Sequence, residues 1–200
     1  MKARAKNPFK AQPDWQYNAC IDNYMQFERL AGCYLRSADA LVACAIEDTS
    51  TLDVHVYAIW FLYRHSIELM LKDLIWKSDY AVFGNKQFNF NEMAHHRLQD
   101  LWRDVELRTH KLLGEDFPSK QEQESQMQEL FKELQKHDPD SYSMRYPFDK
   151  KKKRTHLSLT HVKIHTLRKR AHQTIDFLYL LLEMVNFHCD ERSEYERQQR

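Results

Sequence analysis

Residues 52–80 are apolar on nearly every side of a helix, and no other feature limits the fold as strongly. A helix with one apolar stripe covers the side of a protein, whereas one that is apolar all round must be surrounded by other elements. The preceding EDTST supplies Thr51 as an N-cap, and Asp53 then lies in the first turn, where the helix dipole favours a carboxylate. We therefore expect a central helix from Leu52 to about Tyr80.

The segments around this helix also have helical periodicity. Three glycines in the whole chain are too few for the turns of a many-stranded sheet. Ser119 and Glu122 form a capping box, and Gly114 is a suitable stop for the helix before it. We predict an all-α fold, an antiparallel helical bundle of about five helices with a basic, aromatic loop before the last long helix. Besides the central helix, the expected helices run from about Asp14 to Ile46, Asn91 to Leu113, Ser119 to before Pro139, and Leu159 to Cys189.

The domain organisation follows from the same pattern. The sequence predicts a flexible basic arm at residues 1–13, a single domain at residues 14–189, and a charged tail that frays at residues 190–200. No apolar region follows the basic N-terminus, as a signal peptide would require, and charged residues interrupt the later apolar runs. The cysteines lack C-x-x-C spacing. We expect a cytoplasmic protein with free thiols and no membrane partner.

A polar cluster interrupts the central helix at spacings that place its members on one face. Arg64, His65, Glu68 and Lys72 lie three, four and seven residues apart, so the carboxylate can bind cations one turn away on either side. Buried charges cost several kcal/mol unless they are paired. Two interpretations remain: a structural polar knot, or a pocket with a function.

The neighbouring helices carry two further polar rows. His96, Arg103 and His110 recur every seven residues, which is about 10.5 Å along a helix and suits an exposed charged face better than one site. His161 and His165 have the i, i+4 spacing of zinc ligands, but neither an H-E-x-x-H motif nor a cysteine pair accompanies them. We expect no metal and no cofactor. His161 and His165 begin a polar row on the last helix. The row indicates a basic or pH-sensitive surface, and its further members are Arg168, His172 and Asp176.

Basic residues concentrate before and within the last helix. Residues 145–170 contain ten Lys or Arg and one acid, whereas residues 115–140 contain eight acids and three lysines. Tyr142, Tyr146 and Phe148 alternate with these cations, a mixture that suits single-stranded nucleic acid because rings stack on bases while cations neutralise phosphates. A solvated lysine run is the alternative. The candidate nucleic-acid-binding residues are Arg145, Tyr146, Lys150, Lys151, Lys152, Lys153, Arg154, Arg168 and Arg170.

The chain resembles the HEPN superfamily (higher eukaryotes and prokaryotes nucleotide-binding) over roughly residues 15–188. The resemblance is carried by YRHSIELMLKDLIW at 63–76, HHRLQDLWRDVELRTH at 95–110, SMRYPFD at 143–149 and the long closing helix. It implies a helical bundle, frequent homodimerisation, and in many members metal-independent RNA cleavage in toxin or antiphage-defence settings, where a partner protein such as an antitoxin can be present.

Active members of that family carry an Arg and a His with four to six residues between them. Arg103 and His110 match this spacing, and so do Arg154 and His161. If the chain cleaves RNA, the resemblance implies that Arg103 stabilises charge on the phosphate and His110 transfers protons, with Arg64, His65 and Glu68 supporting them. The alternative is a non-catalytic helical module that binds nucleic acid, nucleotide or a partner protein.

Overall fold

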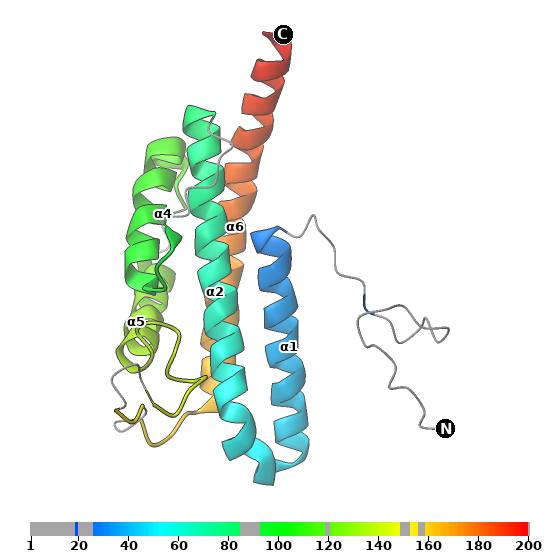
Figure 1. The fold of residues 1–200 in the computed structure, drawn as a ribbon. Helices are drawn as coiled ribbons and strands as arrows, with labels where there is room; N and C mark the ends of the chain where they lie inside the picture. Colours follow the sequence, from blue (N-terminus) through cyan, green and yellow to red (C-terminus); the bar gives the residue numbers. More distant parts are fainter. Residues whose placement is uncertain are drawn as a thin grey trace, which may run out of the picture.

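A computed structural model describes residues 19, 26–84, 93–118, 121–148, 153–155 and 159–199, which form an all-α helical bundle (Figure 1). Two 3-10 turns, η2 (Thr49–Thr51) and η3 (Gly114–Asp116), follow α1 and α4. Within these ranges the one β-type pairing is an isolated bridge between Phe148 and Arg154. The predicted fold class is confirmed. The helices are α1 (Phe27–Glu47), α2 (Leu52–Phe83), α4 (Leu98–Leu113), α5 (Gln121–His137) and α6 (Ile164–Gln198).

Helix α2 is the central element, as its apolar surface predicts. It packs against α1, α4 and α6, and in its middle every residue from Tyr63 to Ile75 except His65 is buried. Figure 1 shows α2 and α6 side by side, with α1 along one side and α4 and α5 along the other. The helix ends at Gly84, whose φ of 68° is left-handed and therefore suits glycine.

Three expected helix starts are wrong. The first helix begins at Phe27 instead of about Asp14, since Ala19 and Gln26 are not helical. The third helix begins at Leu98 instead of Asn91. Because residues 94–97 are not helical, His96 does not lie on that helix with Arg103 and His110 as expected. The last helix begins at Ile164 instead of Leu159. The N-terminal arm 1–13, most of 14–25, Asn91 and Ser119 lie outside the described residues.

The charged C-terminal segment also differs from its prediction, because α6 continues to Gln198 instead of fraying after Cys189. One tertiary contact and one contact within the helix account for the difference. The Tyr80 hydroxyl of α2 is 2.7 Å from the Ser193 hydroxyl, and Arg192 pairs with Glu196 one turn further along α6. The contact between Tyr80 and Ser193 extends the packing of α2 on α6 beyond the apolar stripe. In the part of the chain that is described, no helix combines the length and apolar character needed to cross a membrane.

The start of α2 follows its prediction in position but not in chemistry. Thr51 is the N-cap residue, yet its hydroxyl donates to the Asp48 carbonyl at 2.7 Å and caps no amide of α2. Asp48 instead caps the 3-10 turn η2, accepting from the Ser50 amide at 3.1 Å. The expected side-chain cap of α2 by Thr51 is therefore wrong.

Candidate nucleic-acid interface

Arg64 is a fully buried arginine at the point where three segments meet. From α2 it donates to Glu68 Oε2 at 3.1 Å, to the His96 carbonyl at 2.6 Å and to the Pro139 carbonyl at 3.4 Å. Its Nε lies 3.8 Å from Asp138 Oδ2. One side chain thus joins the central helix to the segment before α4 and to the loop after α5. We call Arg64, Glu68, Lys72, His96 and Asp138 the anchor network.

Glu68 is the carboxylate on which the other half of the anchor network converges. Its Oε1 accepts from Lys72 Nζ at 2.7 Å and lies 2.8 Å from His96 Nδ1. Burial acts to raise the pKa of Glu68, but Lys72, His96 and Arg64 outweigh it, and the pKa lies below its ordinary value. Of the cationic partners expected for Glu68 on α2, Arg64 and Lys72 are therefore present and His65 is not, while His96 is an additional partner.

Asp138 organises the loop that begins directly after α5. Its Oδ1 accepts from the Tyr142 and Ser143 amides, both at 2.7 Å, and folds the chain back on itself. Ser141, between them, is buried and has a left-handed φ of 54°, which is uncommon for a residue other than glycine. Its carbonyl accepts from Arg145 Nε at 2.7 Å. The loop therefore has a defined shape, set by a carboxylate that Arg64 holds.

Burial is the dominant influence on the pKa values of two other groups on α2, Arg64 and His65. It lowers the pKa of Arg64, against the opposing effects of Asp138 and Glu68. It also lowers the pKa of His65, which stands beside the anchor network without joining its hydrogen bonds. His65 is therefore a neutral ring at neutral pH, and its contacts are aromatic.

Those contacts belong to a row of rings that crosses from α1 over α2 to the loop. His65 stacks on Phe61 with centroids 5.3 Å apart, and Tyr34 of α1 meets it edge-on at 4.7 Å. The Arg145 guanidinium lies 5.2 Å from the centre of the Phe61 ring and 5.7 Å from that of Tyr146. Tyr146 in turn stacks on Tyr142 at 4.3 Å. We call this row the aromatic ladder; its members in spatial order are Tyr34, His65, Phe61, Arg145, Tyr146 and Tyr142.

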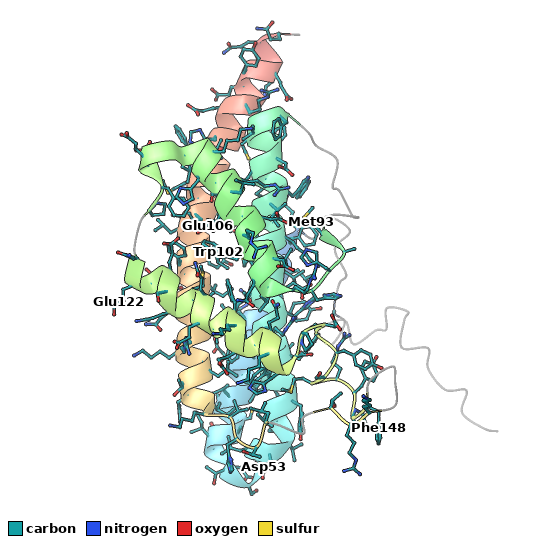
Figure 2. All side chains as sticks on the ribbon, turned by 90° about the vertical axis from the view of Figure 1, so that its left-hand side faces the viewer. Asp53, Met93, Trp102, Glu106, Glu122 and Phe148 are labelled. Atoms are coloured by element: carbon teal, nitrogen blue, oxygen red, sulfur yellow. The ribbon has the colours of Figure 1, made fainter. Side chains whose placement is uncertain are left out.

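The loop end of the aromatic ladder is open to solvent. Arg145 is exposed and 46% of Tyr146 is accessible, while the rings on α1 and α2 are partly covered. Phe148, at 48%, lies further along the same loop, with the Arg154 guanidinium 6.0 Å from its ring centre (Figure 2). Such rings and guanidinium planes are surfaces on which an unpaired base can stack.

The structure divides the residues predicted to bind nucleic acid into groups. Arg145, Tyr146 and Arg154 share the loop surface with Lys153, whereas Lys150, Lys151 and Lys152 lie outside the described residues. Arg168 and Arg170 point to different neighbours: Arg168 pairs with Asp39 of α1 at 3.0 Å, and Arg170 pairs with Glu129 of α5 at 2.9 Å. The candidate interface is accordingly centred on the loop.

Arg103 and His110, the residues carried over from the family motif, are both on the exposed face of α4. The Arg103 side chain is 78% exposed, 3.9 Å from Asp100, and His110 stacks on Phe117 with centroids 3.8 Å apart. No contact among the described residues joins either one to Arg64, His65 or Glu68. The supporting cluster therefore serves the loop and not this pair.

A second polar cluster, between α1, α2 and α6, was not expected from the sequence. Asp39 accepts from the Tyr63 hydroxyl at 2.8 Å and contacts His172 Nε2 at 3.0 Å and Arg168 Nε at 3.0 Å. Burial opposes ionisation, yet His172, Tyr63 and Arg168 together lower the pKa of Asp39. This cluster joins Arg168 and His172 of α6 to α1, which gives these two members of the predicted row a structural role.

The ladder residues Tyr34 and Phe61 were likewise missed. Phe61 and His65 are four residues apart, a spacing that places two rings on one face of a helix, so the sequence held a signal for this half of the ladder. No group of three or more His, Cys, Asp or Glu that could hold a metal occurs within the described ranges. Comparisons with protein-family models, with curated proteins and with solved structures found no match to this chain.

Proposed function

We propose that this protein binds single-stranded RNA on the aromatic ladder and the basic loop beside it. The observation that carries the proposal is the position of Arg145 between Phe61 and Tyr146, with a second stacked pair on each side. Bases of a single strand stack on such rings regardless of sequence, and arginine adds both a planar face and a positive charge for the phosphates.

The charge distribution supports the same ligand. Lys153 and Arg154 follow the ladder in the chain, within a run of five consecutive cations. A single strand is favoured over a duplex because rings of this kind reach only unstacked bases. The anchor network supports the proposal by giving the loop one shape before RNA arrives, so less ordering entropy opposes binding.

The test is the affinity for a labelled RNA of about twelve uridines, measured by fluorescence anisotropy without divalent metal. Tyr146→Ala is expected to weaken binding by roughly 5- to 150-fold, the effect of losing about 1 to 3 kcal/mol of stacking for one base. Tyr146→Phe keeps the ring and should bind like the unmodified protein. Tyr195→Ala removes a tyrosine of similar exposure on α6 and is the matched control.

Binding should also weaken as salt rises, because phosphate contacts release counterions. The Arg145→Ala variant should have a shallower salt dependence than the unmodified protein. Binding that is unaffected by Tyr146→Ala, or lost equally in Tyr195→Ala, would contradict the proposal.

RNA cleavage stays a prediction of the HEPN resemblance. Arg103 and His110 are seven residues apart, about 10.5 Å along α4, so one phosphate would need a second copy of the chain to complete the site. RNA cleavage by Arg103 and His110 therefore requires that the protein forms a homodimer. Incubation of RNA with the protein without divalent metal tests it: fragments that disappear in both Arg103→Ala and His110→Ala support cleavage, and intact RNA despite binding supports a non-catalytic module.

A further inference from the structure

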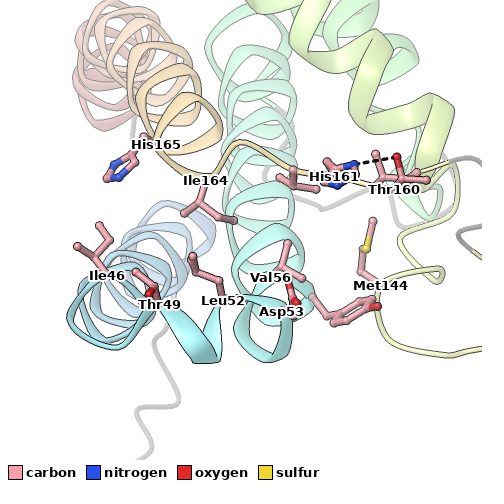
Figure 3. A pocket seen from close by; sticks show the side chains of 13 residues that line it. Ile46, Thr49, Leu52, Asp53, Val56, Met144, Thr160, His161, Ile164 and His165 are labelled. Carbon is pink, nitrogen blue, oxygen red and sulfur yellow. Dashed lines mark hydrogen bonds between the residues drawn. The ribbon is translucent and has the colours of Figure 1, made fainter.

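A pocket of about 660 Å³ opens at the end of the bundle where α1 and α2 are joined (Figure 3). Its walls come from the end of α1, the start of α2, the segment 159–163 before α6, and Met144 of the loop. The volume lies within the range of pockets that hold small ligands. The space is large enough for one nucleoside, and its lining indicates which one.

The pocket adjoins the aromatic ladder. Tyr57, in its wall, is one helical turn from Phe61, and Met144, also in the wall, precedes Arg145 in the chain. We therefore expect a strand that stacks along the ladder to continue towards the pocket.

Most of the pocket wall is apolar, which suits the faces of a base. The wall includes Leu52 and Val56 of α2 together with Leu159, Val162 and Ile164. These aliphatic side chains can pack on a heterocycle but cannot distinguish one base from another. Discrimination depends on the few polar groups among them.

Asp53 is the only carboxylate in the pocket wall. Its exposed side chain makes no hydrogen bond or ion pair with any of the described residues. In Figure 3 it lies below Val56 on the α2 side, with Thr160 and His161 on the other side. A carboxylate only accepts hydrogen bonds and can take two parallel donors. Guanine alone among the four RNA bases offers two adjacent donors, N1–H and the N2 amino group, on its pairing edge. The corresponding edge of adenine, cytosine or uracil places an acceptor beside its donor, which a carboxylate repels.

The opposite wall supplies a second polar contact. His161 Nδ1 lies 3.0 Å from the Thr160 hydroxyl, a contact that orients the imidazole and leaves Nε2 available to the base. A ring held in this way can complement a carbonyl or a ring nitrogen of the ligand.

We propose that this pocket binds a single unpaired guanine, with Asp53 accepting from N1–H and the N2 amino group. This inference rests on the proposed RNA binding and adds a base preference to it. The aromatic ladder then holds the strand, and the pocket selects the nucleotide beside it.

The experiment compares three RNAs of about twelve uridines that carry one central guanosine, inosine or adenosine. Inosine lacks only the N2 amino group, so the unmodified protein should bind the guanosine RNA roughly tenfold more tightly than the inosine RNA, the effect of one hydrogen bond to a charged group. Adenosine should be weaker still. Because the change is made in the RNA, this comparison does not depend on the folding of a variant.

Asp53→Asn should abolish the guanosine preference while leaving the affinity for uridines unchanged. Glu47→Gln, an exposed acid nearby that does not line the pocket, is the matched control and should keep the preference. Equal affinity for all three RNAs overturns the inference but leaves RNA binding intact. Absence of binding to any RNA refutes the proposed function itself, and a preference that survives Asp53→Asn overturns the role of Asp53.

Discussion

Helices α2 and α4 each carry a cluster of charged residues spaced three and four apart, yet the two clusters have opposite surroundings. On α2, Arg64 and Glu68 are 0% and 1% exposed and join segments that are far apart in the chain. On α4, Asp100 pairs with Arg103 and with Arg97, the residue just before the helix, in contact with solvent. The difference is set by the residues between the charges: α2 is apolar on its other faces and must be enclosed, whereas α4 is apolar on one face only. Charge spacing alone therefore does not identify a site.

The largest expected contrast is in stability. Arg64→Ala leaves Glu68 and Asp138 buried without their shared cation, and should lower the free energy of unfolding by roughly 3 to 5 kcal/mol. Arg103→Ala, on the exposed face of α4, should change it by less than about 0.5 kcal/mol. Urea denaturation followed by circular dichroism measures both. Equal effects of the two substitutions would show that the anchor network has no special role.

Neutralising one carboxylate on each helix sharpens the comparison. Glu68→Gln keeps the shape of the side chain but removes the charge that Arg64, Lys72 and His96 share, and we expect a loss of about 1.5 to 3 kcal/mol. Asp100→Asn should cost about 1 kcal/mol or less, as exposed pairs do. If Glu68→Gln were as mild as Asp100→Asn in the same urea titrations, the pairing around Glu68 would contribute little.

A third difference is backbone strain, which lies in the loop after α5. Ser141 has a left-handed φ, and its buried hydroxyl has no hydrogen-bond partner among the described residues. Ser141→Gly should therefore raise the melting temperature, by the equivalent of roughly 1 kcal/mol. An exposed serine in a helix, Ser37 of α1, is the control, because Ser37→Gly should be destabilising there. A lower melting temperature for Ser141→Gly would mean that the loop is not held in this conformation.

The smallest effect is in the pH dependence. The pKa of His65 is lowered by burial, so below its ordinary value near 6.5 the unfolded chain takes up a proton that the folded chain does not. Stability from this group is present above that pH and is lost as pH falls towards the folded pKa. His65→Phe should thus make the decline in stability between about pH 7 and 5 shallower. If His65→Phe leaves this slope unchanged, the conclusion that His65 is neutral in the folded protein is contradicted.

Much of the fold could be predicted because apolar periodicity is local. The apolar residues at 52–80 were enough to place α2 in the centre, and Met127, Leu130, Phe131 and Leu134 formed the expected buried face of α5. The site could be predicted only in part. The spacing on α2 indicated the cluster around Glu68, but Asp138 and His96 reach it from distant segments, and no local pattern indicates such partners.

The central claim is that Asp138, held by Arg64, shapes the loop so that Arg145 can complete the aromatic ladder. A double-mutant cycle with Asp138→Ala and Arg145→Ala, read out as the dissociation constant for single-stranded RNA, tests it most directly. We predict strong coupling: Arg145→Ala should weaken binding several-fold in the unmodified protein and hardly at all once Asp138 is replaced, while circular dichroism shows that both proteins remain helical. Equal losses from Arg145→Ala in both backgrounds would contradict the account.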